Sequence, residues 1–124
     1  MNALYVDGRV DLDASLPDIE TAVRCLDGVN HTLLVVELPS GATITVGGGP
    51  NRFVVEVAEN ETDRWSVLDP RRPEGRVHLV VGGELVDAPA RLCVDREAVL
   101  EAVRTFVEGN GARSARLQWS VEKT

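Results

Sequence analysis

The spacing of apolar residues along the chain predicts two helices. Residues 16–26 carry apolar side chains at intervals of three and four, and residues 98–107 repeat this pattern. Ser15 and Asp95 precede the two runs as helix N-caps, and a glycine closes each run. We therefore expect one helix to begin after Ser15 and the other after Asp95.

Other apolar runs have the spacing or the length of strands. Residues 42–46 (ATITV) alternate between apolar and polar side chains, as half-buried strands do, and in residues 53–58 the large apolar Phe53, Val55 and Val57 alternate with Val54, Glu56 and Ala58. Residues 32–38 (TLLVVEL) are almost continuously apolar, which favours a central strand. The same reasoning predicts further strands at residues 3–7, 65–68, 77–81, 90–94 and 116–122.

The order of these elements sets the expected fold class. Strands follow one another in a long series between the two helices and do not alternate with them, which is typical of α+β proteins. We expect a mostly antiparallel β-sheet with two helices packed on one face. A length of 124 residues fits a single domain over residues 1–124.

Charge and hydropathy narrow the range of partners. The chain has a net charge of −7, with 20 acidic residues against 13 lysines and arginines. Nucleic-acid binding needs a basic face, so this balance argues against it; the charge is compatible with solubility alone and also with steering toward a basic partner. No run approaches the roughly 18 apolar residues that span a bilayer, and the N-terminus lacks the pattern of a signal peptide. A cytoplasmic location without membrane contact is therefore expected.

Three consecutive glycines, Gly47 to Gly49, raise the question of a phosphate-binding loop. Such loops lead from a strand into a helix, whereas Pro50 and another predicted strand follow here. The glycines are better explained by a tight hairpin corner with positive φ and a bulge, where another segment approaches closely. The pair Gly82 and Gly83 has the same interpretation.

A search for catalytic or metal-binding groups finds no convincing set. Two cysteines and two histidines lack the short spacings of zinc sites, so two reduced, largely buried thiols and no metal or cofactor are expected. A histidine within a predicted strand leaves a hydrolase as a weaker hypothesis. These four residues are Cys25, Cys93, His31 and, within the strand, His78.

Read in order, several segments are similar to a known protein family. They are TITVGGGPNRFVV, VHLVVGGELVDAPARLCVD and LQW, which together span much of residues 32–120. They resemble the first-numbered family of bacterial immunity proteins from polymorphic toxin systems, often found beside toxins with deaminase domains. The structural signature consists of Gly47, Gly48, Gly49, Pro50, Gly82, Gly83 and Trp119.

The resemblance implies a non-enzymatic α+β protein that binds and neutralises one cognate toxin, such as a deaminase or another nucleic-acid-modifying enzyme. A small-molecule-binding or sensing domain is the alternative. A monomer is expected, and Trp119 is expected to be largely buried against the second helix near Phe106.

Acidic residues near two predicted hairpins are the first candidates for toxin contact, because they complement a basic cleft. Trp65 is a candidate aromatic anchor, and Asn51 and Arg52 at the glycine corner form an alternative contact. The candidate acids are Glu56, Glu59, Glu61, Asp63, Glu84 and Asp87.

Overall fold

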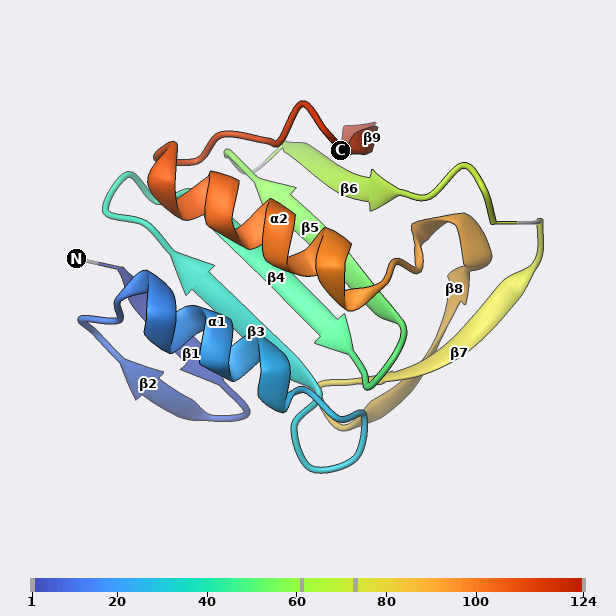
Figure 1. Cartoon of the computed structure of the whole chain (residues 1–124), viewed down its shortest axis with the longest axis horizontal. Coiled ribbons are helices and arrows are strands. Elements are labelled where there is room, and N and C mark those ends of the chain that lie inside the picture. The colour runs from blue at the N-terminus through green and yellow to red at the C-terminus, as the bar shows by residue number, and fades with distance from the viewer. Residues whose placement is uncertain (1, 61, 73, 124) are drawn as a thin grey trace.

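The computed structural model describes residues 2–60, 62–72 and 74–123, and its main feature is an antiparallel sheet of seven strands (Figure 1). The strand order is β2-β1-β3-β4-β5-β6-β9. The bounds are β1 (Ala3–Val6), β2 (Arg9–Asp11), β3 (Leu33–Glu37), β4 (Thr43–Gly48), β5 (Phe53–Ala58), β6 (Asp63–Leu68) and β9 (Gln118–Lys123).

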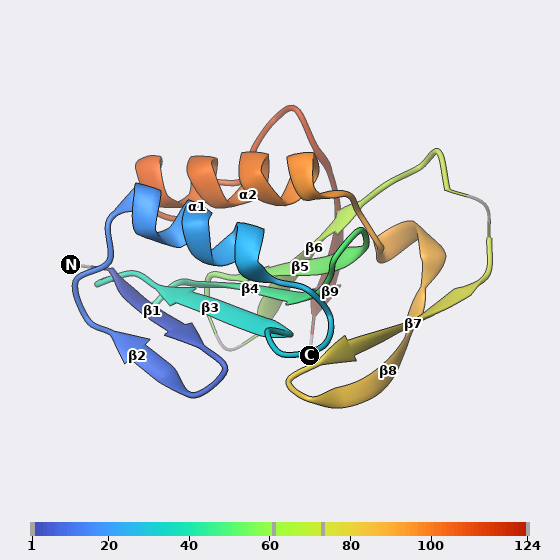
Figure 2. The same ribbon diagram turned by 60° about the horizontal axis from the view of Figure 1, so that its bottom comes forward.

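Both helices lie on the same face of this sheet, as Figure 2 shows. They are α1 (Leu16–Cys25) and α2 (Arg96–Glu108). The predicted caps are present: Ser15 Oγ accepts the Asp18 amide at 3.3 Å, and Asp95 Oδ1 accepts the Ala98 amide at 2.9 Å. The predicted α+β class, the helices and their caps are confirmed. No helix in the described ranges is long and apolar enough to cross a bilayer.

The core fills the space between the helices and the sheet. Ile19 of α1 and Phe106 of α2 are fully buried against alternate strand residues such as Val46 and Phe53. Burying a large apolar side chain contributes roughly 1.5–3 kcal/mol, so this layer holds the helices on the sheet. The opposite face carries the half-buried residues of the same strands, and neither α1 nor α2 lies over it.

The described residues also form a two-stranded hairpin outside the large sheet. Its strands are β7 (Arg76–Val81) and β8 (Glu84–Pro89), joined at Gly82 and Gly83. The strand predicted at residues 90–94 is wrong. Ala90–Leu92 form a 3₁₀ turn (η1), closed by a bond from the Cys93 amide to the Ala90 carbonyl. This turn buries the apolar residues of the segment without needing a strand.

Strand β2 was not predicted, although its signal is in the sequence. Asp7 and Gly8 have φ of 47° and 89° and form a two-residue turn between β1 and β2. An Asp-Gly pair between residues of strand type favours such a hairpin. All three residues of β2 are exposed, so the segment lacks the buried alternation on which the other strand predictions rest.

The glycine corner brings three elements together. The β4–β5 register is regular through Gly48, so the predicted bulge is absent. Gly48 and Gly49 have φ of 102° and 114°. A Cβ on Gly49 would lie 2.6 Å from the Leu26 carbonyl oxygen, and one on Gly47 would lie 2.6 Å from a Val81 methyl. The glycines therefore let the β4–β5 turn contact the end of α1 and let β7 approach β4.

The structure tests two predictions about burial. Trp119 packs against the core, as predicted, and keeps part of its surface exposed because it lies on the last strand of the sheet; its Nε1 donates to the Ser114 carbonyl at 3.0 Å. Cys93 is buried as expected, but Cys25 is exposed at the last residue of α1.

Candidate functional site

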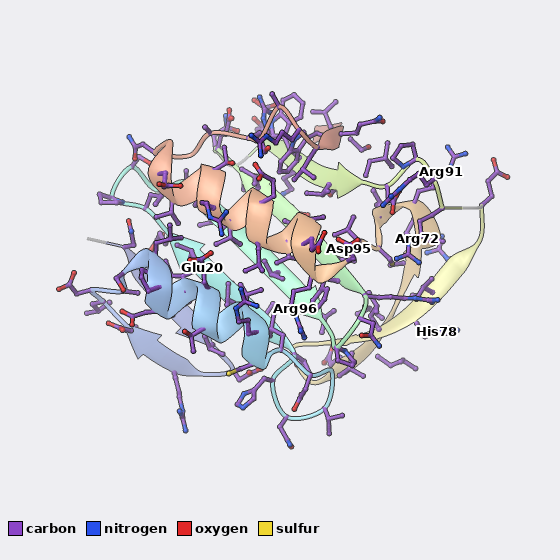
Figure 3. All side chains as sticks on the ribbon, in the orientation of Figure 1. Glu20, Arg72, His78, Arg91, Asp95 and Arg96 are labelled. Carbon is purple, nitrogen blue, oxygen red and sulfur yellow. The ribbon has the colours of Figure 1, made fainter. Side chains whose placement is uncertain are left out.

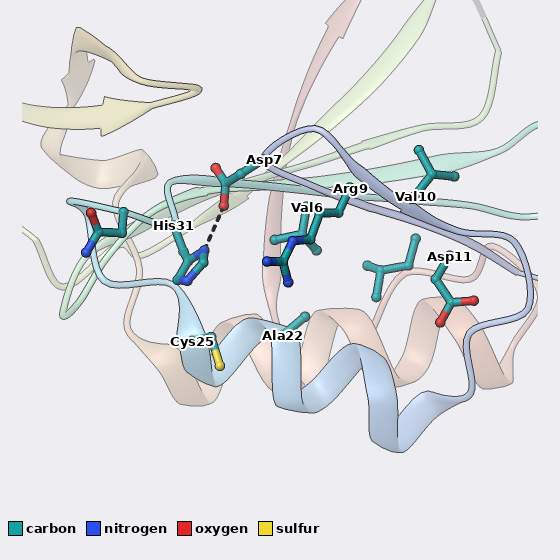
Figure 4. Close-up of a pocket in the computed structure, with 10 residues that line it drawn as sticks. Val6, Asp7, Arg9, Val10, Asp11, Ala22, Cys25 and His31 are labelled. Carbon is teal, nitrogen blue, oxygen red and sulfur yellow. Dashed lines mark hydrogen bonds and ion pairs between the residues drawn. The ribbon is translucent and has the colours of Figure 1, made fainter.

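A hollow lies between the β1–β2 hairpin and α1 (Figure 4). It has a volume of about 590 Å³, within the range of ligand and side-chain pockets. Leu4 and Val6 of β1 form one apolar wall, and Ala22 and Cys25 of α1 form the other. The hollow exists because β2 extends the sheet beyond the edge of α1 and leaves this part uncovered.

Polar groups surround this hollow. Arg9 and Asp11 point from β2 toward α1, whereas the side chain of Val10 points away from α1 (Figure 4). At one end, His31 Nδ1 lies 3.2 Å from Asp7 Oδ2, and the other Asp7 oxygen accepts the Thr32 amide at 3.1 Å. The hollow therefore has an apolar interior and a charged rim.

Asp27 shapes the loop beside this hollow. Its Oδ1 accepts the amides of His31, Val29 and Asn30 at 2.8–3.0 Å. These hydrogen bonds hold the pKa of the Asp27 carboxyl below its ordinary value, and the bond from the His31 amide has the largest effect. The carboxylate thus fixes the loop that places His31 beside Asp7.

Cys25 and His31 both border the hollow beside α1, whereas Cys93 and His78 lie elsewhere in the described ranges. No group of three potential metal ligands forms there. Burial raises the pKa of the Cys93 thiol, which suits an inert core thiol. His78 is exposed on β7, opposite Asp87 (Figure 3).

The acids proposed for partner contact lie on two separate hairpins, β5–β6 and β7–β8. Glu56 projects from the uncovered sheet face and pairs with Arg64 at 2.7 Å. Glu59 lies 3.9 Å from an Arg113 nitrogen, beside the loop that precedes β9. Asp63 accepts from the Asn60 amide group at 3.2 Å, and Glu61 lies outside the described residues.

The remaining acids lie on the β7–β8 hairpin. Glu84 is exposed at the start of β8, and Asp87 forms an ion pair with Arg76 at 2.8 Å. The five described acids are therefore divided between two hairpins and do not form one surface.

The two other proposed contacts are also apart. Trp65 packs against the core on the helix side of β6, and the Arg113 guanidinium lies 3.5 Å from the centroid of its ring. This covers one face of the ring. Asn51 and Arg52 are exposed in the turn between β4 and β5.

Charge is unevenly distributed over the molecule. Residues 2–30, which form the β1–β2 hairpin and α1, hold six carboxylates against two arginines. At the other end, near the β7–β8 hairpin, arginines such as Arg72 and Arg76 are paired with carboxylates, Asp69 and Asp87 (Figure 3). The acidic end is therefore the end with the large hollow, which sequence reasoning missed because it did not predict β2.

Two smaller hollows, of about 260 and 380 Å³, lie where the β7–β8 hairpin meets the uncovered sheet face. Gly47 and Val81 line the first, and Leu33 with Gly82 lines the second. The signature glycines thus shape this corner of the molecule, opposite the helices.

Comparison with known proteins complements this geometry. No curated protein matches the chain closely enough to be counted as a relative. The family model described as Immunity protein Imm1 matches residues 3–121, from the first residue of β1 into β9. The match covers nearly every element of the fold, including both helices and the glycine corner, and so the chain belongs to the Imm1 family of immunity proteins.

Proposed function

We propose that this protein binds one cognate toxin and neutralises it without catalysis, in the cytoplasm of the cell that produces both. The family match over residues 3–121 is the observation that carries the proposal. The protein acts as a monomer that occupies a surface the toxin needs, and it requires neither metal nor cofactor.

The toxin acts on nucleic acid, and a deaminase is the first candidate. An enzyme of this class needs a basic cleft for phosphates, and an acidic protein can occupy such a cleft. The net charge of −7 and the acidic end formed by residues 2–30 support this choice of partner.

Co-expression tests the proposal directly. The toxin domain encoded beside this gene should stop growth when produced alone, and production of this protein should restore growth. A toxin of unrelated sequence should remain lethal in its presence. If cells that produce this protein still fail to grow with the neighbouring toxin, as they do with the unrelated toxin, the proposed function is overturned.

A small-molecule-binding domain is the second candidate, and the hollow beside α1 favours it. However, the buried polar residues Thr32 and Ser114 already have hydrogen-bond partners in the protein, and the buried nitrogens without a partner in the described structure, on Trp65, Arg96 and Arg113, lie away from that hollow. Neither Thr32 nor Ser114 lines that hollow. A specific small ligand usually needs such fixed polar groups, so toxin binding is better supported.

A further inference from the structure

We propose that the toxin docks at the free edge of β2, pairing with this strand and placing an apolar side chain in the hollow beside α1. The inference rests on the proposed function and specifies where binding occurs. It commits to one occupant, an extended segment of a basic protein.

The hydrogen-bonding pattern of the hairpin leaves Val10 available. A two-residue turn closes on a hydrogen-bonded pair, here Val6 and Arg9, and the next pair, Tyr5 and Val10, is then non-hydrogen-bonded. The N–H and C=O of Val10 therefore point away from β1, toward the outer edge. No strand in the described ranges covers this edge, since β2 ends the sheet.

Two large apolar side chains at this edge are exposed to solvent. Val10 is 55% exposed, and Leu12, in the turn after β2, is 65% exposed. Unprotected edge strands tend to pair with other chains, and exposed apolar patches beside them mark interaction surfaces.

Strand addition would use the hollow and these apolar residues together. Side chains alternate along a strand, so a segment paired with β2 points every second side chain toward α1 and the others toward the face of Val10. The hollow of about 590 Å³, lined by Leu4, Val6 and Ala22, has room for a large apolar anchor.

Charge selects the occupant. Asp11 and Asp13 are exposed beside this edge, within the region that has six carboxylates and two arginines. Arg9 at the rim is available to a backbone carbonyl or a carboxylate of the partner. The segment before the opposite edge, β9, carries Arg113 and Arg116, each 3.9 Å from a carboxylate, and so offers a basic chain no comparable excess of negative charge.

Two pairs of matched variants test the location. The probe is a catalytically inactive form of the toxin domain encoded beside this gene. Leu12→Arg should weaken its binding at least tenfold, whereas Leu85→Arg, at a leucine of similar exposure on β8 (69%), should change it less than twofold. Asp11→Asn with Asp13→Asn should slow association and flatten its salt dependence, whereas Glu59→Gln with Asp63→Asn should do neither.

Amide exchange tests the strand pairing without altering the chain. The Val10 amide should exchange rapidly in the free protein and become protected in the complex, while amides on the outer edge of β9 remain as they were. Unchanged exchange at Val10, or unchanged affinity in Leu12→Arg, would overturn the inference, as would a dimer of this protein alone that protects Val10. If the docking inference fails but the wild-type protein still binds the toxin, the proposed function stands. If the wild-type protein neither binds the toxin nor protects cells from it, both the inference and the proposed function are refuted.

Discussion

At the scale of single residues, Glu101 connects α2 to the segment before β9. Its carboxylate accepts hydrogen bonds from Ser114 Oγ at 2.6 Å and Thr105 Oγ1 at 3.0 Å. These bonds hold the pKa of Glu101 below its ordinary value of 4.5. The stabilisation is therefore fully present above about 4.5, the pKa in the unfolded chain, and is lost as the pH falls through the lower folded value.

Replacing Glu101 with Gln should lower the free energy of unfolding at pH 7 by about 1 kcal/mol, because a charge-assisted hydrogen bond becomes neutral. The difference from wild type should shrink at pH 3. Urea unfolding of both proteins at the two pH values measures this difference. The contributions of the other carboxylates to its pH dependence cancel, because both proteins have them. An equal difference at pH 7 and pH 3 would assign the effect to packing.

Trp119 packs on the margin of the core, so its truncation should cost less than the roughly 3–5 kcal/mol of a fully buried tryptophan. We expect Trp119→Ala to lose about 2 kcal/mol and Trp119→Phe to lose about half as much, because the phenyl ring keeps most of the contact. Chemical denaturation gives both values. A cost of Trp119→Ala near zero would show that the ring contributes little to packing.

At the scale of elements, the β4–β5 turn and the end of α1 depend on a backbone contact. Gly49→Ala should destabilise the protein by at least about 2 kcal/mol, since its Cβ would meet the Leu26 carbonyl and its φ of 114° disfavours a side chain. Gly41→Ala is the control. Its φ is 92° with no atom within 4 Å of the added carbon, so it should cost about 1 kcal/mol. Equal melting temperatures for the two variants would contradict the contact.

Elements with a buried face could be predicted from the sequence, and exposed elements could not. The apolar stripe of α2 and the alternation in β5 indicate which face of each element packs against the core. Strand β2 buries none of its residues and β8 buries only Ala88, so their sequences lack the pattern of a buried face from which a strand can be predicted. The β1–β2 turn was nevertheless readable from Asp7 and Gly8, because that pair favours a two-residue hairpin.

The candidate surface was harder to predict for the same reason. Acidic residues close in sequence, such as Glu56 and Glu59, lie on opposite sides of the sheet because side chains alternate along the strand and its extension. The excess of carboxylates in residues 2–30 is visible in the sequence, whereas the structure shows that the β1–β2 hairpin and α1 place it at one end of the molecule (Figure 1).

At the scale of the whole molecule, the excess of carboxylates at the end formed by residues 2–30 predicts how the protein associates with its partner. The acidic end should face the basic surface of the toxin, so association should be fast at low salt and slow as salt is added. Stopped-flow measurement of the association rate at several salt concentrations tests this. A rate independent of salt would show that charge does not guide the encounter.

The central claim is that this protein inhibits the toxin encoded beside it by stoichiometric binding. The most direct test is titration of the purified toxin, acting on its nucleic-acid substrate, with purified protein. The account predicts that turnover falls linearly and reaches zero at one equivalent, with no change in the protein itself. Full turnover in the presence of a large excess of protein would contradict it.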